Sequence, residues 1–285
     1  MIVKELGPLQ SDDLLAKAGR HTEEQMAYYL RRAFAAVEDV RVFHDLRLEH
    51  NGEATQIDHL VLHRWGIVLI ESKSVTTTVR VNKQGEWARR VNGRWQGMPS
   101  PVLQVKRQGD LLKALLKENV ERLLEKILVL QVRFGHMPVD YLVAISDGGL
   151  IERVGNPNLP EVCKSDQVTE RVIALVTHYR KANSLLTTLA GGDDKGSWHT
   201  LLPQEIQRIS AFLVQRHTPL SVFAPGIAAP PEAKTVSALE VCAQCRKGVT
   251  PAVARYCQDQ ERRFGGKIYC MEHQRGRSYP STSAP

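Results

Sequence analysis

The hydrophobic residues of the N-terminal part recur with the spacing of a helix. Met26 and Leu30 share one face of a helix that we expect to begin at Thr22, as its N-cap, and to run to about Val37. Gln25, three residues after Thr22, would complete a capping box. A helix packed on a core through this stripe is therefore predicted.

After this helix the apolar and polar residues alternate with a period of two, which is typical of strands. A meander of three consecutive strands is expected at 40–44, 55–63 and 66–73. Shorter strands are expected at 77–81, 87–91 and 141–145. Helical spacing returns at 102–116, 166–181 and 203–215. The mixture predicts an α/β fold for about the first 215 residues.

A change in composition marks the end of this domain. A stretch rich in proline and alanine begins near residue 218. We expect a domain at 1–217, a linker at 218–238, a small module at 239–274 and a disordered tail at 275–285. The module is too short to bury a core unaided, so it needs a metal or a cross-link.

Charge and hydropathy narrow the class of protein. Lys and Arg number 38 against 31 Asp and Glu, a formal charge of +7 in 285 residues, which favours an anionic partner without identifying one. No apolar run is long enough for a membrane span, and the N-terminus lacks the apolar segment of a signal peptide. We therefore expect a cytoplasmic protein with no membrane partner.

Two acids and a lysine lie at the end of one apolar hairpin. Glu71 and Lys73 share a face of the strand 66–73 where its apolar run stops, and Asp58 falls near the open end of the neighbouring strand. Such charges are costly to bury unless they are paired or bind a metal. One interpretation is a Mg²⁺ or Mn²⁺ site formed by Asp58, Glu71 and the Ser72 carbonyl. The alternative is an ordinary Lys–Glu pair at a solvated strand end.

Two further side chains could complete a metal site of this kind. Glu23 lies three residues before Met26 and seven before Leu30, which places it on the core-facing stripe of the first helix, whereas Glu24 faces solvent. The alternative for Glu23 is a first-turn acid that the helix dipole stabilises. Gln104 begins a predicted helix, where its amide could bind a carboxylate, a water or a phosphate. His59 lies on the strand face opposite Asp58 and is expected to be structural.

Together these segments resemble the nuclease-related domain family, NERD. The resemblance covers about residues 15–130 and is carried by Glu23 and its helix, the segments 56–61 and 70–73, Trp87 and the segment 101–104. It implies a restriction-endonuclease-like fold, a mixed sheet flanked by helices, with a PD-(D/E)xK active site. By this resemblance Glu23 is the helix acid, Asp58 and Glu71 bind metal, Lys73 belongs to the E-x-K pair and Gln104 to the P-x-x-Q motif. Thr22 stands where the family usually has glycine.

The leading hypothesis is a metal-dependent nuclease that hydrolyses phosphodiester bonds in DNA. A divalent metal would activate a water, while Lys73 would orient that water or stabilise charge on the phosphorus. The motif is compatible with DNA or RNA and with endo- or exonucleolytic cleavage. The competing hypothesis is a non-catalytic module that binds nucleic acid or protein on a nuclease-like fold.

The C-terminal cysteines predict a second metal. Cys242 with Cys245, and Cys270 with His273, form two ligand pairs that each enclose two residues, the spacing of a zinc knuckle. This predicts a structural Zn²⁺ in a zinc-ribbon-like module that folds on binding metal. Cys257 is expected to be a buried thiol, with replacement of His273 as ligand as the alternative. Basic and aromatic residues between the knuckles could bind nucleic acid, or the rings could form the small core, and such modules also bind proteins.

Overall fold

The structure is a computed structural model that describes residues 1–9, 14–127, 130–131, 134–155, 157–183, 200–219, 241–249 and 251–274. The chain divides into two units, Met1–Val222 and Phe223–Pro285. The expected tail at 275–285 lies outside the described residues, as does the expected linker at 218–238 except for its first two positions. The domain boundaries therefore stay predictions.

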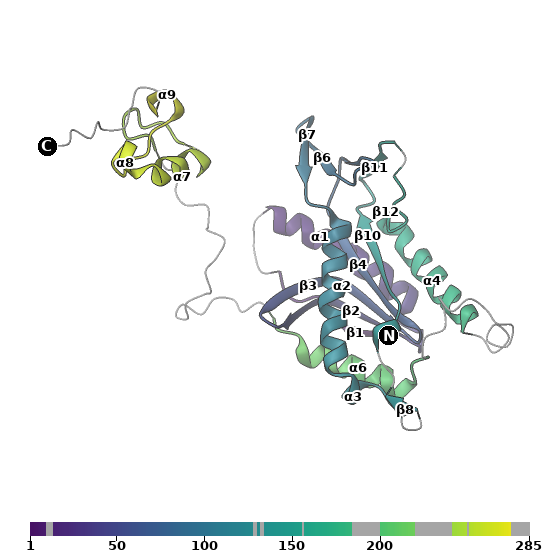
Figure 1. The fold of residues 1–285 in the computed structure, drawn as a ribbon. Coiled ribbons are helices and arrows are strands. Elements are labelled where there is room, and N and C mark those ends of the chain that lie inside the picture. The colour runs from purple at the N-terminus through teal and green to yellow at the C-terminus, as the bar shows by residue number, and fades with distance from the viewer. Residues whose placement is uncertain are drawn as a thin grey trace. The chain divides into compact units, whose positions relative to one another are not determined.

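A six-stranded mixed sheet forms the centre of the larger unit (Figure 1), with the strand order β1-β2-β3-β4-β10-β12. The strands are β1 (Ile2–Lys4), β2 (Val40–His50), β3 (Glu53–His63), β4 (Gly66–Lys73), β10 (Val139–Ile145) and β12 (Val162–Lys164). Strands β2, β3 and β4 form the predicted antiparallel meander, and β10 joins β4 in parallel.

Helices cover both faces of this sheet. The helices α1 (Leu14–Phe34) and α4 (Val168–Ala182) pack on one face, and α2 (Pro101–Glu118) and α6 (Pro203–Arg216) pack on the other (Figure 1). The smaller elements are α3 (Val120–Leu123), β8 (Lys126–Ile127), β9 (Leu130–Gln131) and the 3₁₀ turns Phe134–His136 and Ser165–Gln167. The predicted mixed α/β fold is confirmed. No helix in the described parts of the chain is long and apolar enough to cross a membrane.

A second, four-stranded sheet has the order β11-β5-β6-β7. Its strands are β5 (Thr78–Val81), β6 (Trp87–Val91), β7 (Arg94–Met98) and β11 (Leu150–Arg153). Asn92 and Gly93 join β6 to β7 with φ angles of 48° and 77°, the geometry of a type I′ hairpin turn. Sequence patterning predicted β6 but not β7, because β7 is exposed along most of its length and shows no clear alternation.

The prediction that Thr22 caps the first helix is wrong. Helix α1 begins at Leu14, and Thr22 is buried in its middle with 4% of its surface exposed. The Thr22 hydroxyl donates a hydrogen bond to the carbonyl of Ala18 at 3.2 Å, one helical turn earlier. A threonine bonded in this way inside a helix gives the same sequence pattern as a cap. The expected stripe of Met26 and Leu30 is fully buried.

The described part of the smaller unit consists of short helices. These are α7 (Pro251–Asp259), α8 (Glu261–Phe264) and α9 (Met271–Gln274), and an isolated β-bridge joins Val241 to Gly248. The ligand spacing of a zinc ribbon is therefore present on a largely helical backbone. Phe264 and Tyr269 are buried in its small core, so these two rings are structural.

Candidate active site and metal centre

Asp58 and Glu71 meet where the ladder between β3 and β4 ends. The last paired residues are His59 and Ile70, so Asp58 and Glu71 are the next residues on their strands. The backbone N–H of Ser72 donates to Asp58 Oδ2 at 2.8 Å. The edge of the hairpin therefore holds two carboxylates on the sheet face that α2 covers.

Lys73 connects this pair of acids to α2. Its Nζ lies 2.6 Å from Glu71 Oε1 and donates to Gln104 Oε1 at 2.9 Å. Ser100 caps α2 by accepting a hydrogen bond from the Leu103 N–H, which fixes the first turn that carries Gln104. Four of the residues predicted from sequence, Asp58, Glu71, Lys73 and Gln104, thus lie in one group, with Ser72 between them.

Burial and the neighbouring charge of Glu71 dominate the electrostatics of Asp58. Burial, reinforced by the charge of Glu71, raises the pKa of Asp58 well above its usual range. The Ser72 N–H and the Lys73 charge oppose this increase without cancelling it. A second cation close to Asp58 would favour its ionised form.

Glu23 lies on α1, with its side chain 25% exposed compared with 57% for Glu24. This difference agrees with the helical-face argument. Burial raises the pKa of Glu23, and Arg20, 3.6 Å away, opposes this increase. The charges of Asp45 and, more weakly, of Glu71 act in the same direction as burial. Among the described residues, three or more side chains that could ligate one metal come together only in the C-terminal unit, so Glu23, Asp58 and Glu71 do not form such a group.

Sequence reasoning missed Gln108. This side chain is 3% exposed, and its Nε2 donates to Glu71 Oε2 at 2.7 Å and to the Gln56 carbonyl at 2.9 Å. Gln108 lies one helical turn after Gln104 on α2, so the repeated glutamine at i and i+4 was the available signal. Its Oε1 is buried and has no hydrogen-bond partner among the described residues.

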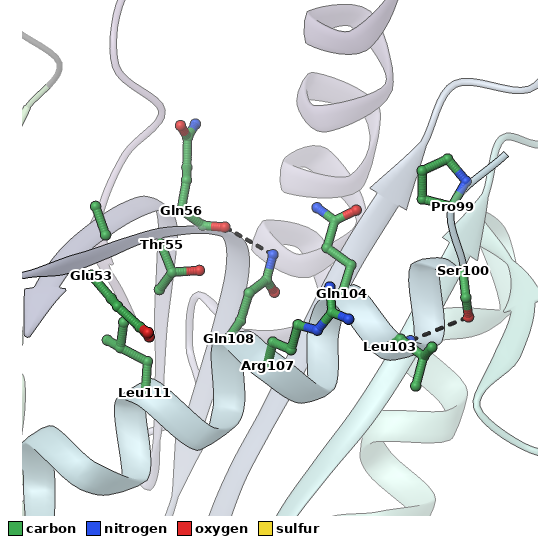
Figure 2. A pocket seen from close by; sticks show the side chains of 11 residues that line it. Glu53, Thr55, Gln56, Pro99, Ser100, Leu103, Gln104, Arg107, Gln108 and Leu111 are labelled. Carbon is green, nitrogen blue, oxygen red and sulfur yellow. Dashed lines mark hydrogen bonds between the residues drawn. The ribbon is translucent and has the colours of Figure 1, made fainter. Parts of the chain in front are cut away.

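A cleft of about 830 Å³ opens beside these side chains. Figure 2 shows Gln104, Arg107 and Gln108 of α2 along it, with Gln56 opposite and Pro99 and Ser100 at the start of the helix. The two glutamines that contact Lys73 and Glu71 therefore also line the cleft. A ligand in the cleft would lie next to the acid–lysine group.

The C-terminal unit brings its four expected ligands together. The Cys242, Cys245, Cys270 and His273 ligand atoms all lie within 4.8 Å of one another. Cys270 Sγ is 3.2 Å from His273 Nδ1, and Cys245 Sγ is 3.8 Å from Cys270 Sγ. The Cys242 N–H bonds the Lys247 carbonyl at 2.9 Å, which closes the turn that carries the first pair. Three thiols and an imidazole in this arrangement match the donor set of a structural zinc site.

Cys257 lies outside that group. It is fully buried, and its sulfur accepts hydrogen bonds from the Tyr269 N–H at 3.4 Å and from Gln274 Nε2 at 3.2 Å. These contacts fit the expectation of a buried core thiol. Cys163 is likewise buried, in the core beneath α1 and α4.

Residues 18–146 match the family model of the nuclease-related domain, NERD. This match confirms the resemblance, over a slightly longer span than the expected 15–130. No curated protein and no solved structure matches the chain. The matched span contains Glu23, Asp58, Glu71, Lys73 and Gln104, while the Cys/His group lies beyond it.

Proposed function

We propose that the larger unit is a nuclease that hydrolyses phosphodiester bonds in DNA with Mg²⁺ or Mn²⁺. The observation that carries this proposal is the group of two carboxylates, one lysine and one glutamine beside an open cleft within a nuclease-related domain. The donors suit a hard divalent cation, because two carboxylate side chains and a backbone carbonyl supply the oxygen ligands that Mg²⁺ and Mn²⁺ prefer.

In this proposal Asp58, Glu71 and the Ser72 carbonyl would hold the cation, which would supply an activated water and offset charge on the phosphate. Glu71 and Gln104 hydrogen-bond Lys73 and hold its ammonium group in one position. From this position Lys73 would stabilise charge that develops on the phosphate. Gln104 lines the cleft and can also contact a phosphate oxygen. Glu23 contributes a further acid from α1.

We also propose that the C-terminal unit binds one structural Zn²⁺ through Cys242, Cys245, Cys270 and His273, and that it assists binding of nucleic acid or of a protein partner. The two metals are distinct because thiolates select softer ions than carboxylates do. Under this proposal the zinc folds the small unit and takes no part in hydrolysis.

Cleavage of linear, circular and single-stranded DNA should be measured with the full chain in EDTA, Mg²⁺ and Mn²⁺. Activity should require the metal and should be abolished in Asp58→Ala and Glu71→Ala, whereas Lys73→Ala should reduce turnover more than metal binding. Glu121→Ala is a matched control, because Glu121 is an exposed acid on α3 with no ion pair among the described residues. Activity that survives in EDTA or in both acid variants would refute the mechanism. Binding without cleavage under all conditions would favour a non-catalytic module.

A further inference from the structure

Strands β6 and β7 form a ribbon that projects beyond the rest of their sheet (Figure 1). We call residues 87–98 the β6–β7 ribbon. Trp87 and Met98 pack on the core at its base, whereas residues 89–97 are all exposed. An isolated two-stranded hairpin is marginally stable, so the packed base and the type I′ turn keep this tip ordered.

The exposed part of the ribbon is cationic. Arg89, Arg90 and Arg94 lie within six positions, and no acid occurs between Glu86 and Asp110. Within the described parts of the chain, the structure records no ion pair for these three arginines. Clustered like charges repel one another, so an anionic partner would relieve the repulsion.

Arg80, on strand β5 of the same sheet, has a structural role and differs in this from the three ribbon arginines. Arg80 donates from Nε and Nη2 to the Glu152 carboxylate at 3.1 Å, and its guanidinium lies 3.8 Å from the centre of the Trp95 ring. It therefore fastens the ribbon to β5 and β11. Within the described ranges, Arg89, Arg90 and Arg94 have no comparable side-chain contact, so their guanidinium groups are available to a ligand.

The register of the ribbon places cations on both of its faces. Arg89 pairs with Gln96, and Val91 pairs with Arg94, so these residues share one face. Arg90 pairs with Trp95 on the other face. A flat partner would meet only one of these faces, whereas a groove with phosphates along both walls would meet both.

We propose that the β6–β7 ribbon enters the major groove of duplex DNA, with Arg89, Arg90 and Arg94 on the phosphates. The proposal rests on the proposed nuclease function, and it deepens it by naming the form of the substrate. The major groove of B-form DNA, about 12 Å wide, admits a two-stranded ribbon. The major groove of A-form RNA is too narrow for side chains to enter.

The ribbon also leads directly to the candidate active site. Strand β7 ends at Met98, and the next two residues, Pro99 and Ser100, already line the cleft (Figure 2). Helix α2 continues from there with Gln104 and Arg107 along the same cleft. A duplex held by the ribbon would therefore lie against the helix whose glutamine contacts Lys73.

The test compares two triple variants that each remove three positive charges. One changes Arg89, Arg90 and Arg94 to Gln in the ribbon. The control changes Lys117, Arg122 and Arg180 to Gln, which are exposed helix residues with no ion pair in the described parts of the chain. Binding to a fluorescent duplex of about 30 base pairs is measured by anisotropy in buffer without Mg²⁺ or Mn²⁺ and without chelator, so that the proposed zinc is retained. Thermal unfolding of both variants is the check on folding.

The ribbon variant should bind duplex DNA at least about tenfold more weakly near 0.1 M salt, and its plot of log affinity against log salt should be shallower by about three. The control variant should bind nearly as the parent does. Equal losses in the two variants, or an equal loss on single-stranded DNA and duplex RNA, would overturn groove binding by the ribbon.

Because binding is measured without Mg²⁺ or Mn²⁺, the result does not depend on hydrolysis. If the protein never cleaves DNA but its duplex binding depends on the three ribbon arginines, the nuclease function is refuted and groove binding by the ribbon is supported. A ribbon variant that still cleaves DNA and binds the duplex with the parent's affinity would refute groove binding by the β6–β7 ribbon and support the nuclease function.

Discussion

Replacing Gln108 by methionine tests whether the Glu71 carboxylate needs a hydrogen-bond donor on each of its two oxygens. Glu71 is only 2% exposed, and Lys73 and Gln108 each donate to one of its carboxylate oxygens, at 2.6 and 2.7 Å. Methionine has a similar length but no donor. The change therefore leaves Glu71 Oε2 and the Gln56 carbonyl without their present partner.

The size of the effect follows from these contacts. A buried acceptor left without a donor costs about 1–3 kcal/mol. The substitution also removes the unpartnered Oε1 of Gln108, which offsets part of the loss. We expect a net loss of about 2 kcal/mol without metal, which in a domain of this size lowers the unfolding temperature by about 4–8 °C.

Two measurements check this expectation. Thermal unfolding in EDTA should show the loss, and Mg²⁺ should reduce it, because a cation on Glu71 replaces the missing donor. The Mg²⁺ concentration for half-maximal cleavage should rise about tenfold with little change in rate at saturation. Gln215→Met, an exposed glutamine on α6, is the matched control. A variant that unfolds like the parent in EDTA and needs no additional Mg²⁺ would refute the reasoning.

Two further predictions concern the two metal sites. Burial and the Glu71 charge raise the pKa of Asp58 above 3.8, so its ionisation costs stability as the pH rises through the raised pKa. In EDTA, Asp58→Asn should therefore unfold at a higher temperature than the parent by a margin that grows above pH 3.8; a margin independent of pH would contradict this. Cys242→Ser should lose the zinc measured by mass spectrometry, whereas Cys257→Ser should keep it; loss in both would make Cys257 a ligand.

The meander and the acid–lysine pair were predictable because strand alternation is a local property. The turn at Asn51 and Gly52 and the apolar run from Ile67 to Ile70 fix β3 and β4 within a few residues of their predicted bounds. Once this hairpin is placed, Glu71 and Lys73 must share a face.

Features that depend on distant partners were not predictable in the same way. The sequence alone does not distinguish Gln108 from an ordinary helix residue, because its contact with Glu71 exists only once α2 packs over β4. Gly109 allows the close approach of α2, since a Cβ at this position would lie 2.5 Å from the Tyr141 ring. Likewise, the sequence pattern of Thr22 matches an N-cap, whereas in the structure its hydroxyl contacts the hydroxyl of Ser146, which lies far away in the sequence. In both cases a tertiary contact decides the role of a polar residue.

Strand alternation also decides which side chains can supply positive charge near the acids. His59 follows Asp58 in the sequence but points to the opposite face, where its Nδ1 lies 2.8 Å from Nδ1 of His44. Burial lowers the pKa of His59 well below its usual range and that of His44 to about 4, so both rings are neutral at neutral pH. Neither histidine can therefore balance Asp58 and Glu71. Under the proposed mechanism, the positive charge that balances the two carboxylates must come from Lys73 and a bound divalent cation. Removing the cation should therefore affect Asp58 and Glu71 most strongly and leave the histidine pair unchanged.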